Sequence, residues 1–379
     1  MILLDIIDNI DKKLIFDDFD DIDDFTDYKS IILKFRNNYE TYNDINCEFI
    51  SNIINTKNIK KGMDFEVKCK VVDFLGAGSY GKVYKLKING KYYALKINEN
   101  EIPTNLKQRY ESLTSVSHLK KYIINIFVCG NLNSDKYQYF SIMEYGGKNL
   151  KSQIPFENAD EIIFVVRQLY NIVYLCEKER LYLTDFKFNN IVLNNKDYRL
   201  KLIDIYIQCK NYNPCKECRI VKTYSTLEMD RIKNILDDEN YNHKYHYIPL
   251  AVGLIDLLCV KSFSNITSML TTNFDIDLTL KQTIPLIQVA IYNLEHNSSS
   301  LVKQEYYQVY KIKKKIEKKF PIIKEPEFYN YLMNLIQVRD KYKNIIPTKK
   351  LHKIIHNLFS AYPNDRTLEP LKEHISKHM

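Results

Sequence analysis

Three glycines in residues 75–84 are spaced so that the backbone between them could bind phosphate. Counted from Gly76 as the first position, Gly78 is the third and Gly81 the sixth. Because glycine has no Cβ, a turn built on this spacing can approach phosphate oxygens closely. Dinucleotide-binding folds share the spacing, but there a helix follows the glycines. Here strand-like residues flank the run on both sides, and no acidic ribose-binding residue is evident at a further strand end. The pattern therefore favours a phosphate loop within a β-hairpin.

A lysine on the next predicted strand is a second phosphate-binding candidate. Lys96 ends the sequence Tyr-Ala-Leu-Lys and follows an Asn-Gly pair. A glycine-rich hairpin followed by a strand lysine resembles the protein kinases, in which this lysine meets the α and β phosphates of ATP and an acid from the next helix. Glu111 is the candidate acid, since Glu99 and Glu101 follow the strand too closely. The resemblance implies that ATP also contacts the glycine run, at Leu75, Gly76, Ala77, Gly78, Ser79, Tyr80, Gly81 and Val83.

A second group of polar residues lies between positions 183 and 204. The run Asp-Phe-Lys-Phe-Asn-Asn at 185–190, followed by Leu-Ile-Asp at 202–204, is similar to the kinase catalytic loop and its later metal-binding aspartate. The resemblance implies that Asp185 orients and deprotonates the attacking hydroxyl and that Lys187 steadies the γ-phosphate. It also implies that Asn190 and Asp204 hold Mg²⁺ against the phosphates. A lysine two positions after the aspartate is typical of serine/threonine kinases.

The resemblance extends over residues 65–374. Met-Glu-Tyr-Gly at 143–146 resembles the kinase hinge, which implies that the backbone of Glu144 and Gly146 reads the adenine edge. Ser-Thr-Leu-Glu at 225–228 resembles the Ala-Pro-Glu element, and Pro-Asn-Asp-Arg at 363–366 resembles the late arginine element. An ion pair between Glu228 and Arg366 is therefore predicted.

The sequence departs from the family at three places. Leu183 and Thr184 replace the His and Arg before the catalytic aspartate, which removes a receptor for an activation-loop phosphate. Tyr206 replaces the glycine after the metal-binding triplet, and the apolar stretch at 248–260 lacks an aspartate at its start. The alternative to an active enzyme is a pseudokinase scaffold that binds nucleotide and docks partners. An active kinase is favoured, because buried charges are unfavourable without phosphate and metal to pair with them.

Two further alternatives concern the class of kinase. A small-molecule kinase is disfavoured because such enzymes rarely combine the full glycine loop with an Ala-Pro-Glu-like element and a late arginine. The divergent motifs and the Ile, Asn, Lys and Tyr bias resemble kinases of large DNA viruses, although a divergent protist enzyme has the same features. Protein substrates with Ser or Thr acceptors are expected for a viral and for a protist kinase alike.

The elements that position these residues follow from hydrophobic patterning. Alternating apolar runs predict strands at 65–75, 82–88, 91–97, 123–129 and 137–143, with a charged helix near 104–119. Asn89-Gly90 predicts a hairpin turn, because both residues tolerate positive φ. Helical periods follow at 159–178, 248–260, 280–294, 305–320, 327–341 and 351–362.

This order predicts an α+β, kinase-like, two-lobed fold. The N-lobe, residues 63–147, is expected to be a five-stranded antiparallel sheet with one helix, and the C-lobe, residues 148–379, to be larger and mostly helical. ATP is expected to bind between them. Residues 1–62 form a separate acidic extension in which seven aspartates at 17–27 alternate with Phe and Ile. That segment is interpreted equally well as a partner-docking segment or as a solvated acidic helix face.

Composition and charge disfavour several other classes of protein. The net charge of +8 is spread along the chain, so no nucleic-acid partner is expected. The longest apolar stretch, 248–260, is too short to cross a bilayer, so no membrane anchor is expected. A Cys-x-x-Cys pair at 215 and 218 lies near Cys209, and His243 or His246 could supply the fourth ligand that a structural zinc site needs. Reduced cysteines in an intracellular loop are favoured over such a site. No leader-like segment opens the sequence, which favours the cytoplasm, meaning host cytoplasm or virion for a viral protein.

Overall fold

The protein is a mixed α+β chain that divides into two compact units. The first unit comprises residues 1–115 and 123–147, and the second comprises 116–122 and 148–379. The computed structural model describes residues 10–11, 13–14, 31–37, 64–78, 81–98, 117–132, 139–179, 181–183, 186–194, 197–204, 207–209, 246–275, 280–295, 318, 325–360 and 365–377. Among these residues, the first unit contains a mostly antiparallel sheet and the second is largely helical.

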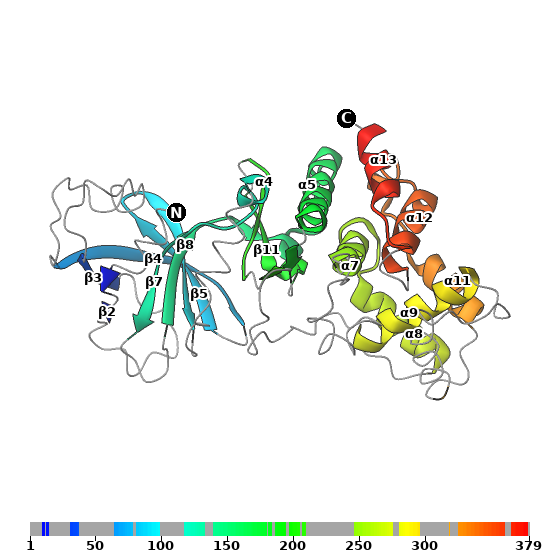
Figure 1. The fold of residues 1–379 in the computed structure, drawn as a ribbon, viewed down its shortest axis with the longest axis horizontal. Helices are drawn as coiled ribbons and strands as arrows, with labels where there is room; N and C mark the ends of the chain where they lie inside the picture. The colour runs from blue at the N-terminus through cyan, green and yellow to red at the C-terminus, as the bar shows by residue number, and fades with distance from the viewer. Residues whose placement is uncertain are drawn as a thin grey trace. The chain divides into compact units, whose positions relative to one another are not determined.

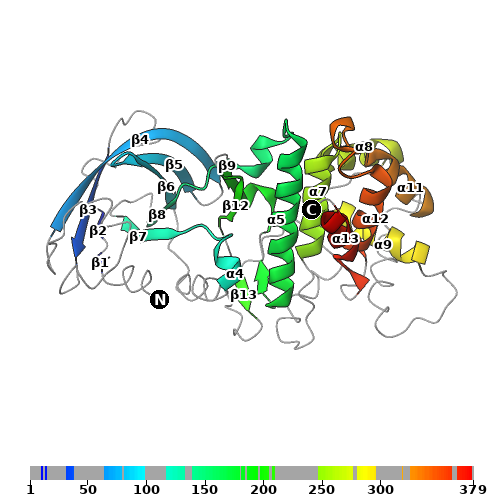
Figure 2. The same cartoon turned by 90° about the horizontal axis from the view of Figure 1, so that it is seen from above.

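The middle of the sheet consists of the strands that the sequence predicts. They are β4 (Asp64–Gly78), β5 (Gly81–Ile88), β6 (Lys91–Asn98), β7 (Ile126–Leu132) and β8 (Tyr139–Glu144). These five pair antiparallel in the order β4-β5-β6-β8-β7 (Figures 1 and 2, with all five labelled in Figure 2). Asn89 and Gly90 have φ of 45° and 82°, which confirms the predicted turn between β5 and β6.

Three further strands come from the N-terminal extension, which the sequence did not predict. They are β1 (Ile10–Asp11), β2 (Lys13–Leu14) and β3 (Ile31–Asn37). β3 pairs antiparallel with the first half of β4, from Ile31 opposite Cys69 to Arg36 opposite Asp64, and β2 pairs parallel with β7. The described sheet therefore has eight strands rather than five. The aspartate-rich segment at 17–27 lies outside the described residues.

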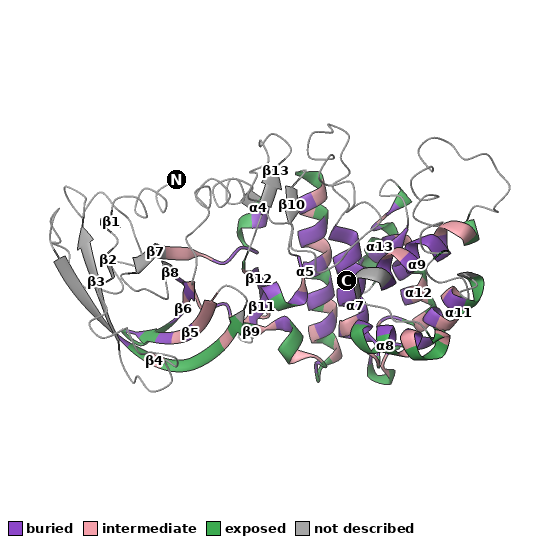
Figure 3. Ribbon diagram, turned by 90° about the horizontal axis from the view of Figure 1, so that it is seen from below, coloured by how far each residue is buried: buried purple, intermediate pink, exposed green. Residues whose placement is uncertain are grey.

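Alternation along the strands determines which face of the sheet is buried. Tyr84, Leu86 and Ile88 of β5 are buried together with Leu95 and Ile97 of β6, whereas most described positions of β4 are exposed (Figure 3). Of the helix predicted near 104–119, the structure describes only α4 (Ser117–Lys120), which belongs to the second unit.

Short strands open the second unit. β11 (Ile191–Asn194) pairs with both β9 (Lys148–Asn149) and β12 (Arg199–Leu202), and β10 (Leu181–Leu183) pairs with β13 (Ile207–Cys209). All of these pairs are antiparallel. Two 3₁₀ turns, η3 (Leu150–Gln153) and η4 (Phe188–Asn190), precede α5 and β11 respectively.

Helix α5 (Ala159–Lys178) lies between this small sheet and α7 (Tyr247–Leu258) (Figures 1 and 2). Its first turn is capped by Asn158, whose side chain accepts from the N–H of Asp160, and its bounds are those that the sequence predicts. One face of α5 is buried, whereas α7 is buried almost all round because eleven of its twelve residues are. A helix of that kind belongs to the centre of a core rather than its surface.

The remaining helices pack beyond α7. They are α8 (Phe263–Phe274), α9 (Leu280–Glu295), α11 (Glu325–Leu335), η8 (Asp340–Tyr342), α12 (Thr348–Phe359) and α13 (Glu369–Lys377). α9, α11 and α12 were predicted, with α11 ending earlier than expected. α8 and α13 were not predicted, and the helix expected at 305–320 lies almost wholly outside the described residues.

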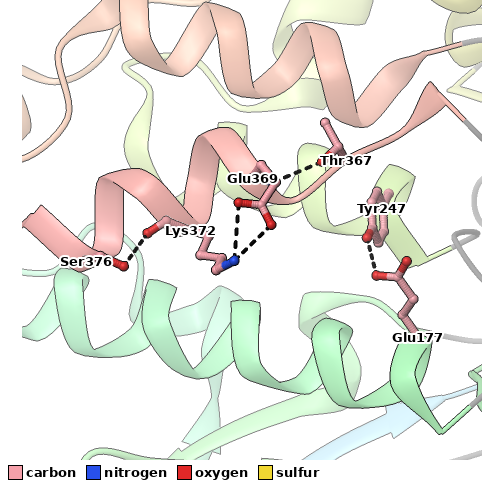
Figure 4. A network of polar contacts seen from close by, with 6 residues as sticks. All are labelled: Glu177, Tyr247, Thr367, Glu369, Lys372 and Ser376. Atoms are coloured by element: carbon pink, nitrogen blue, oxygen red, sulfur yellow. Dashed lines mark hydrogen bonds and ion pairs between the residues drawn. The ribbon is translucent and has the colours of Figure 1, made fainter.

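Side-chain contacts join α7 to α5 and fix the first turn of α13. The Tyr247 hydroxyl of α7 donates to the Glu177 carboxylate of α5 (Figure 4). The first turn of α13 is fixed by Glu369, whose N–H donates to the Thr367 hydroxyl at 3.1 Å and whose carboxylate accepts from Lys372 at 3.0 Å. None of the helices in the described part of the chain is long and apolar enough to span a membrane.

Candidate active site

The glycine run closes the hairpin between β4 and β5. Gly78 pairs with Gly81, and the two residues between them, Ser79 and Tyr80, lie outside the described residues. A Cβ on Gly76 would have no heavy atom within 4 Å, so a ligand could approach the backbone there. A Cβ on Gly81 would lie 1.8 Å from the carbonyl oxygen of Ile97. The first glycine therefore leaves room for phosphate, whereas the third is required by contact with the neighbouring strand.

Lys96 lies on the same face of the sheet as the candidate nucleotide-binding residue Val83. The two residues are directly opposite each other on β5 and β6, and Lys96 is half-buried. Paired residues of antiparallel strands point to the same side. The apolar side chain of Val83 and the positive charge of Lys96 therefore lie next to each other, on the two strands that follow the glycine run. Leu75 and Ala77 are exposed on β4. Glu111, the predicted partner of Lys96, lies outside the described residues.

The end of β8 is fixed by Asn125, a residue that sequence reasoning did not single out. The side-chain amide of Asn125 donates to the Glu144 carboxylate at 3.0 Å, and its backbone N–H donates to the same oxygen at 3.3 Å. In return the Glu144 N–H donates to the Asn125 carbonyl at 2.8 Å. Because this N–H is already used, the adenine contact predicted for Glu144 would have to use its carbonyl. Gly146 follows two residues later and is buried.

Tyr145 of the same segment is held by a cation–π contact. The Lys85 ammonium lies 4.3 Å from the Tyr145 ring centroid and 4.4 Å from that of Tyr92. The two tyrosine rings are themselves 6.3 Å apart. Such contacts contribute about 0.5–1 kcal/mol each at exposed positions. Together with Asn125 they fix both residues 144 and 145 to the sheet.

In the second unit, backbone pairing brings Asn190 and Asp204 together. Ile191 pairs with Leu202 on β11 and β12, and one step beyond that pair the Ile203 N–H donates to the Asn190 carbonyl at 2.9 Å. Asp204 is the next residue. Asn190 is 9% exposed, whereas Asp204 is exposed and has a φ of 52°. A non-glycine residue with positive φ is uncommon, and such residues concentrate at functional sites.

Lys187 lies between two buried phenylalanines that pack on α7. The Phe186 ring meets the ring of His246 edge to face, with centroids 6.4 Å apart, and both residues are buried. Phe188 packs against the one glycine of α7, because a Cβ on Gly253 would lie 2.2 Å from the Phe188 ring. The first turn of α7 lacks the aspartate that the kinase resemblance expects. Aromatic packing on α7 holds this segment instead.

The other side of the segment is tied to β9 and β13. The Asn149 side chain donates to the Asn189 carbonyl. Leu183, just before the candidate catalytic residues, pairs with Ile207, just after Asp204. Sequence reasoning did not single out Asn149 or Gly253, and it considered His246 only as a possible zinc ligand. The contacts of all three residues depend on partners far away in the chain.

Asn190 and Asp204 carry the kinds of oxygen ligand that Mg²⁺ prefers. Amide and carboxylate oxygens are hard ligands, and Mg²⁺ is usually held by one or two such protein groups together with phosphate oxygens and water. The hydrogen bond between their two segments fixes the separation of their backbones. Within the described residues no group of three or more His, Cys, Asp or Glu side chains gathers at a candidate metal site. Cys215 and Cys218 lie outside those residues.

Of two other predicted residues, the structure describes one. Asp185, the candidate catalytic base, lies outside the described residues, although Leu183 and Phe186 on either side are placed. Arg366 is fully buried, and its Nε donates to the Ser360 carbonyl at 2.9 Å. Glu228 lies outside the described residues, so its ion pair with Arg366 stays a prediction.

Comparison of the sequence with models of known protein families gave no match.

Proposed function

We propose that this protein is an ATP-dependent protein kinase that transfers the γ-phosphoryl group to Ser or Thr hydroxyls of protein substrates. The observation that supports this most directly is the hydrogen bond from Ile203 to Asn190. It holds the backbone of Asn190 next to that of the residue before Asp204, although the two candidate ligands stand 14 positions apart in the sequence. Lys187 precedes both of them, in the order found in the kinase catalytic loop and its later metal-binding aspartate. The kinase-like two-lobed fold and the likeness to viral kinases are parts of the same proposal.

The first unit is proposed to bind the nucleotide. Lys96 neutralises the α and β phosphates, and Glu111 orients it. The glycine run binds the phosphates through its backbone, with the open position at Gly76 as the point of closest approach. The Glu144 carbonyl and the Gly146 N–H read the adenine edge. Asn125 and Lys85 support this reading by holding the segment in place.

The second unit is proposed to carry the transfer chemistry. Asp185 accepts the proton of the attacking hydroxyl, and Lys187 stabilises charge on the phosphoryl group as it moves. Asn190 and Asp204 would hold Mg²⁺, which supplies charge neutralisation of the phosphate oxygens when it is bound. The protein contributes mainly position, since phosphoryl transfer involves little covalent chemistry of the enzyme itself.

Two substitutions test the proposal through phosphate transfer. Purified protein is incubated with radiolabelled ATP, Mg²⁺ and either casein, histone or myelin basic protein, alongside Lys96→Met and Asp204→Ala. The matched controls are Lys87→Met, an exposed lysine on the same sheet, and Asp340→Ala, an exposed aspartate of η8. We expect transfer to Ser and Thr by the wild type and both controls, and loss of transfer in both test variants.

The outcomes distinguish the proposal from its alternatives. Transfer that survives Lys96→Met and Asp204→Ala contradicts the proposed roles. ATP binding without transfer by the wild type indicates a nucleotide-binding scaffold instead. Transfer to sugars, aminoglycosides or choline but not to proteins indicates a small-molecule kinase. Cytoplasmic location and partner docking through residues 1–62 stay predictions.

A further inference from the structure

Gln168 is a buried polar residue of α5 whose side chain binds the backbone of the turn between β11 and β12. It is 7% exposed. Its amide nitrogen donates to the Tyr198 carbonyl at 2.7 Å, and its amide oxygen accepts from the Leu200 N–H at 3.0 Å. The side chain thus donates to one backbone group, in the turn, and accepts from another, at the start of β12. A buried amide is tolerated only when it is satisfied in this way.

The turn that Gln168 binds has an uncommon conformation. Tyr198 has a φ of 50°, in the left-handed region that disfavours residues with a side chain. Its hydroxyl donates to the Glu161 carboxylate, also on α5, at 2.7 Å. Helix α5 therefore holds Tyr198 both by its carbonyl and by its hydroxyl. Strained backbone persists only where the surroundings determine it, and here α5 supplies that constraint.

The short strand β12 connects the turn that α5 holds to Asp204. β12 has four residues, and Asp204 follows Leu200 by four positions, about 13 Å at the usual rise of a strand. Three backbone donors along this path are used in succession. Leu200 donates to Gln168, Leu202 donates to the Tyr122 carbonyl at 2.6 Å, and Ile203 donates to the Asn190 carbonyl at 2.9 Å. A shift at the first donor would misalign the other two.

We propose that Gln168 is a positioning residue for the metal-binding pair, acting through β12 on the register between Ile203 and Asn190. This inference rests on the proposed function for the role of Asp204, although the anchoring itself does not depend on it. The hydrogen bonds that the structure describes for Gln168 go to the backbone of Phe164, Tyr198 and Leu200, not to Asp204. Its effect is to fix how far Asp204 lies from Asn190.

The test compares Gln168→Met with Gln288→Met. Methionine keeps the length of glutamine and its helix propensity but removes the bonds to Tyr198 and Leu200, together with a 3.5 Å bond to the Phe164 carbonyl of the same helix. Gln288 is the matched control, because it is a buried glutamine of α9 that also donates to a backbone carbonyl, that of Ser360 at 3.4 Å. Both proteins are first examined without nucleotide and metal, by amide hydrogen exchange and thermal unfolding. We expect faster exchange at Leu200, Leu202 and Ile203 in Gln168→Met only.

The second measurement is the Mg²⁺ requirement. With ATP present, the Mg²⁺ concentration for half-maximal phosphate transfer should rise about 10- to 100-fold in Gln168→Met, the range found for residues that orient metal ligands. The KM for the protein acceptor should stay unchanged in both variants. A residue with only a structural role would instead give Gln168→Met and Gln288→Met the same loss of thermal stability and the same Mg²⁺ requirement.

Tyr198→Phe provides a milder variant in case Gln168→Met does not fold. It removes only the hydrogen bond to Glu161, and we expect the same changes in smaller measure. Wild-type exchange at Ile203 in both Gln168→Met and Tyr198→Phe would overturn the inference, whatever the kinase assay shows. A wild-type protein that transfers no phosphate, combined with faster exchange at Ile203 in the variants, would contradict the proposed function and leave the anchoring by Gln168 supported.

Discussion

The N–H of Ile203 donates to the carbonyl of Asn190, and this one backbone contact joins the two segments that carry the candidate metal ligands. Neither segment places its ligand alone. Asn190 ends the 3₁₀ turn η4, and Asp204 follows the end of β12. The pairing of β11 with β12 is therefore the element on which the candidate site depends most directly.

Asp185→Asn is expected to lower turnover by about 10²-fold or more, the loss typical of removing a general base or a group that orients a hydroxyl. ATP affinity should be unchanged, because Asp185 is assigned to the acceptor and not to the nucleotide. Steady-state transfer to a protein acceptor and ATP binding would be measured together, with Asp340→Asn as the control. Equal turnover by wild type and Asp185→Asn would remove Asp185 from the proposed mechanism.

Gly253→Ala is expected to destabilise the protein by about 1–3 kcal/mol, the usual effect of overpacking a core. This reverses the ordinary effect of the substitution in a helix, where alanine is favoured by about 1 kcal/mol. The reason is the 2.2 Å approach of the added Cβ to the Phe188 ring. Urea denaturation would measure the free energy of unfolding.

The double variant Gly253→Ala with Phe188→Leu tests the cause of that loss. The smaller side chain should relieve the clash, so the two substitutions together should destabilise less than the sum of their separate effects. Strict additivity would show that the contact between Gly253 and Phe188 is not what makes glycine necessary at this position.

Gly81→Ala is expected to be more destabilising than Gly76→Ala. Both glycines have positive φ, at 156° and 150°, so both variants introduce backbone strain of about 1–3 kcal/mol. Only Gly81 also faces a backbone atom, the Ile97 carbonyl oxygen at 1.8 Å. Gly76→Ala should instead weaken ATP binding while leaving the sheet intact. Thermal unfolding and nucleotide titration of the two variants would show whether the two glycines divide these roles.

Asp256 is expected to make stability depend on pH. Burial raises the pKa of its carboxyl, although the Phe263 N–H at 2.7 Å and the charges of Lys151 and Arg339 oppose the shift. The folded state therefore keeps the proton to a higher pH than the unfolded chain does. Stability contributed by this group is present at low pH and is lost as pH rises through the interval above its ordinary pKa.

Asp256→Asn should flatten this dependence, because asparagine keeps an oxygen acceptor for the Phe263 N–H and does not titrate. The free energy of unfolding would be measured by urea titration between pH 4 and pH 7 for both proteins. If the difference in stability between wild type and variant stayed constant over that range, the raised pKa of Asp256 would be contradicted.

The sequence was most informative where structure is local. The Asn-Gly pair and the alternating runs beside it identified the hairpin of β5 and β6, because turn chemistry and side-chain alternation are encoded by neighbouring residues. The bounds of α5 followed from its apolar stripe and the preceding Asn158. Helix α13 was missed because it is short and weakly apolar, and β3 was missed because its partner, β4, lies beyond a long intervening segment.

The candidate site was identified as residue types but not as an arrangement. Lys187, Asn190 and Asp204 could be named from their order, whereas the contact that joins their segments depends on strand pairing that no local pattern reveals. Gln168 was missed because a glutamine in a helix usually faces solvent. Its spacing from Val165 and Ile172, three and four residues away on the buried face, was a usable signal.

The pairing of β3 with β4 has a practical consequence for handling the protein. A shortened chain beginning at residue 63, where composition alone separates an acidic tail from a globular domain, would lack Ile31–Asn37 and leave the first half of β4 as a bare edge. Exposed edge strands recruit other chains through their free N–H and C=O groups. We therefore expect such a fragment to aggregate on expression, whereas a fragment that keeps residues from 10 onward should remain monodisperse.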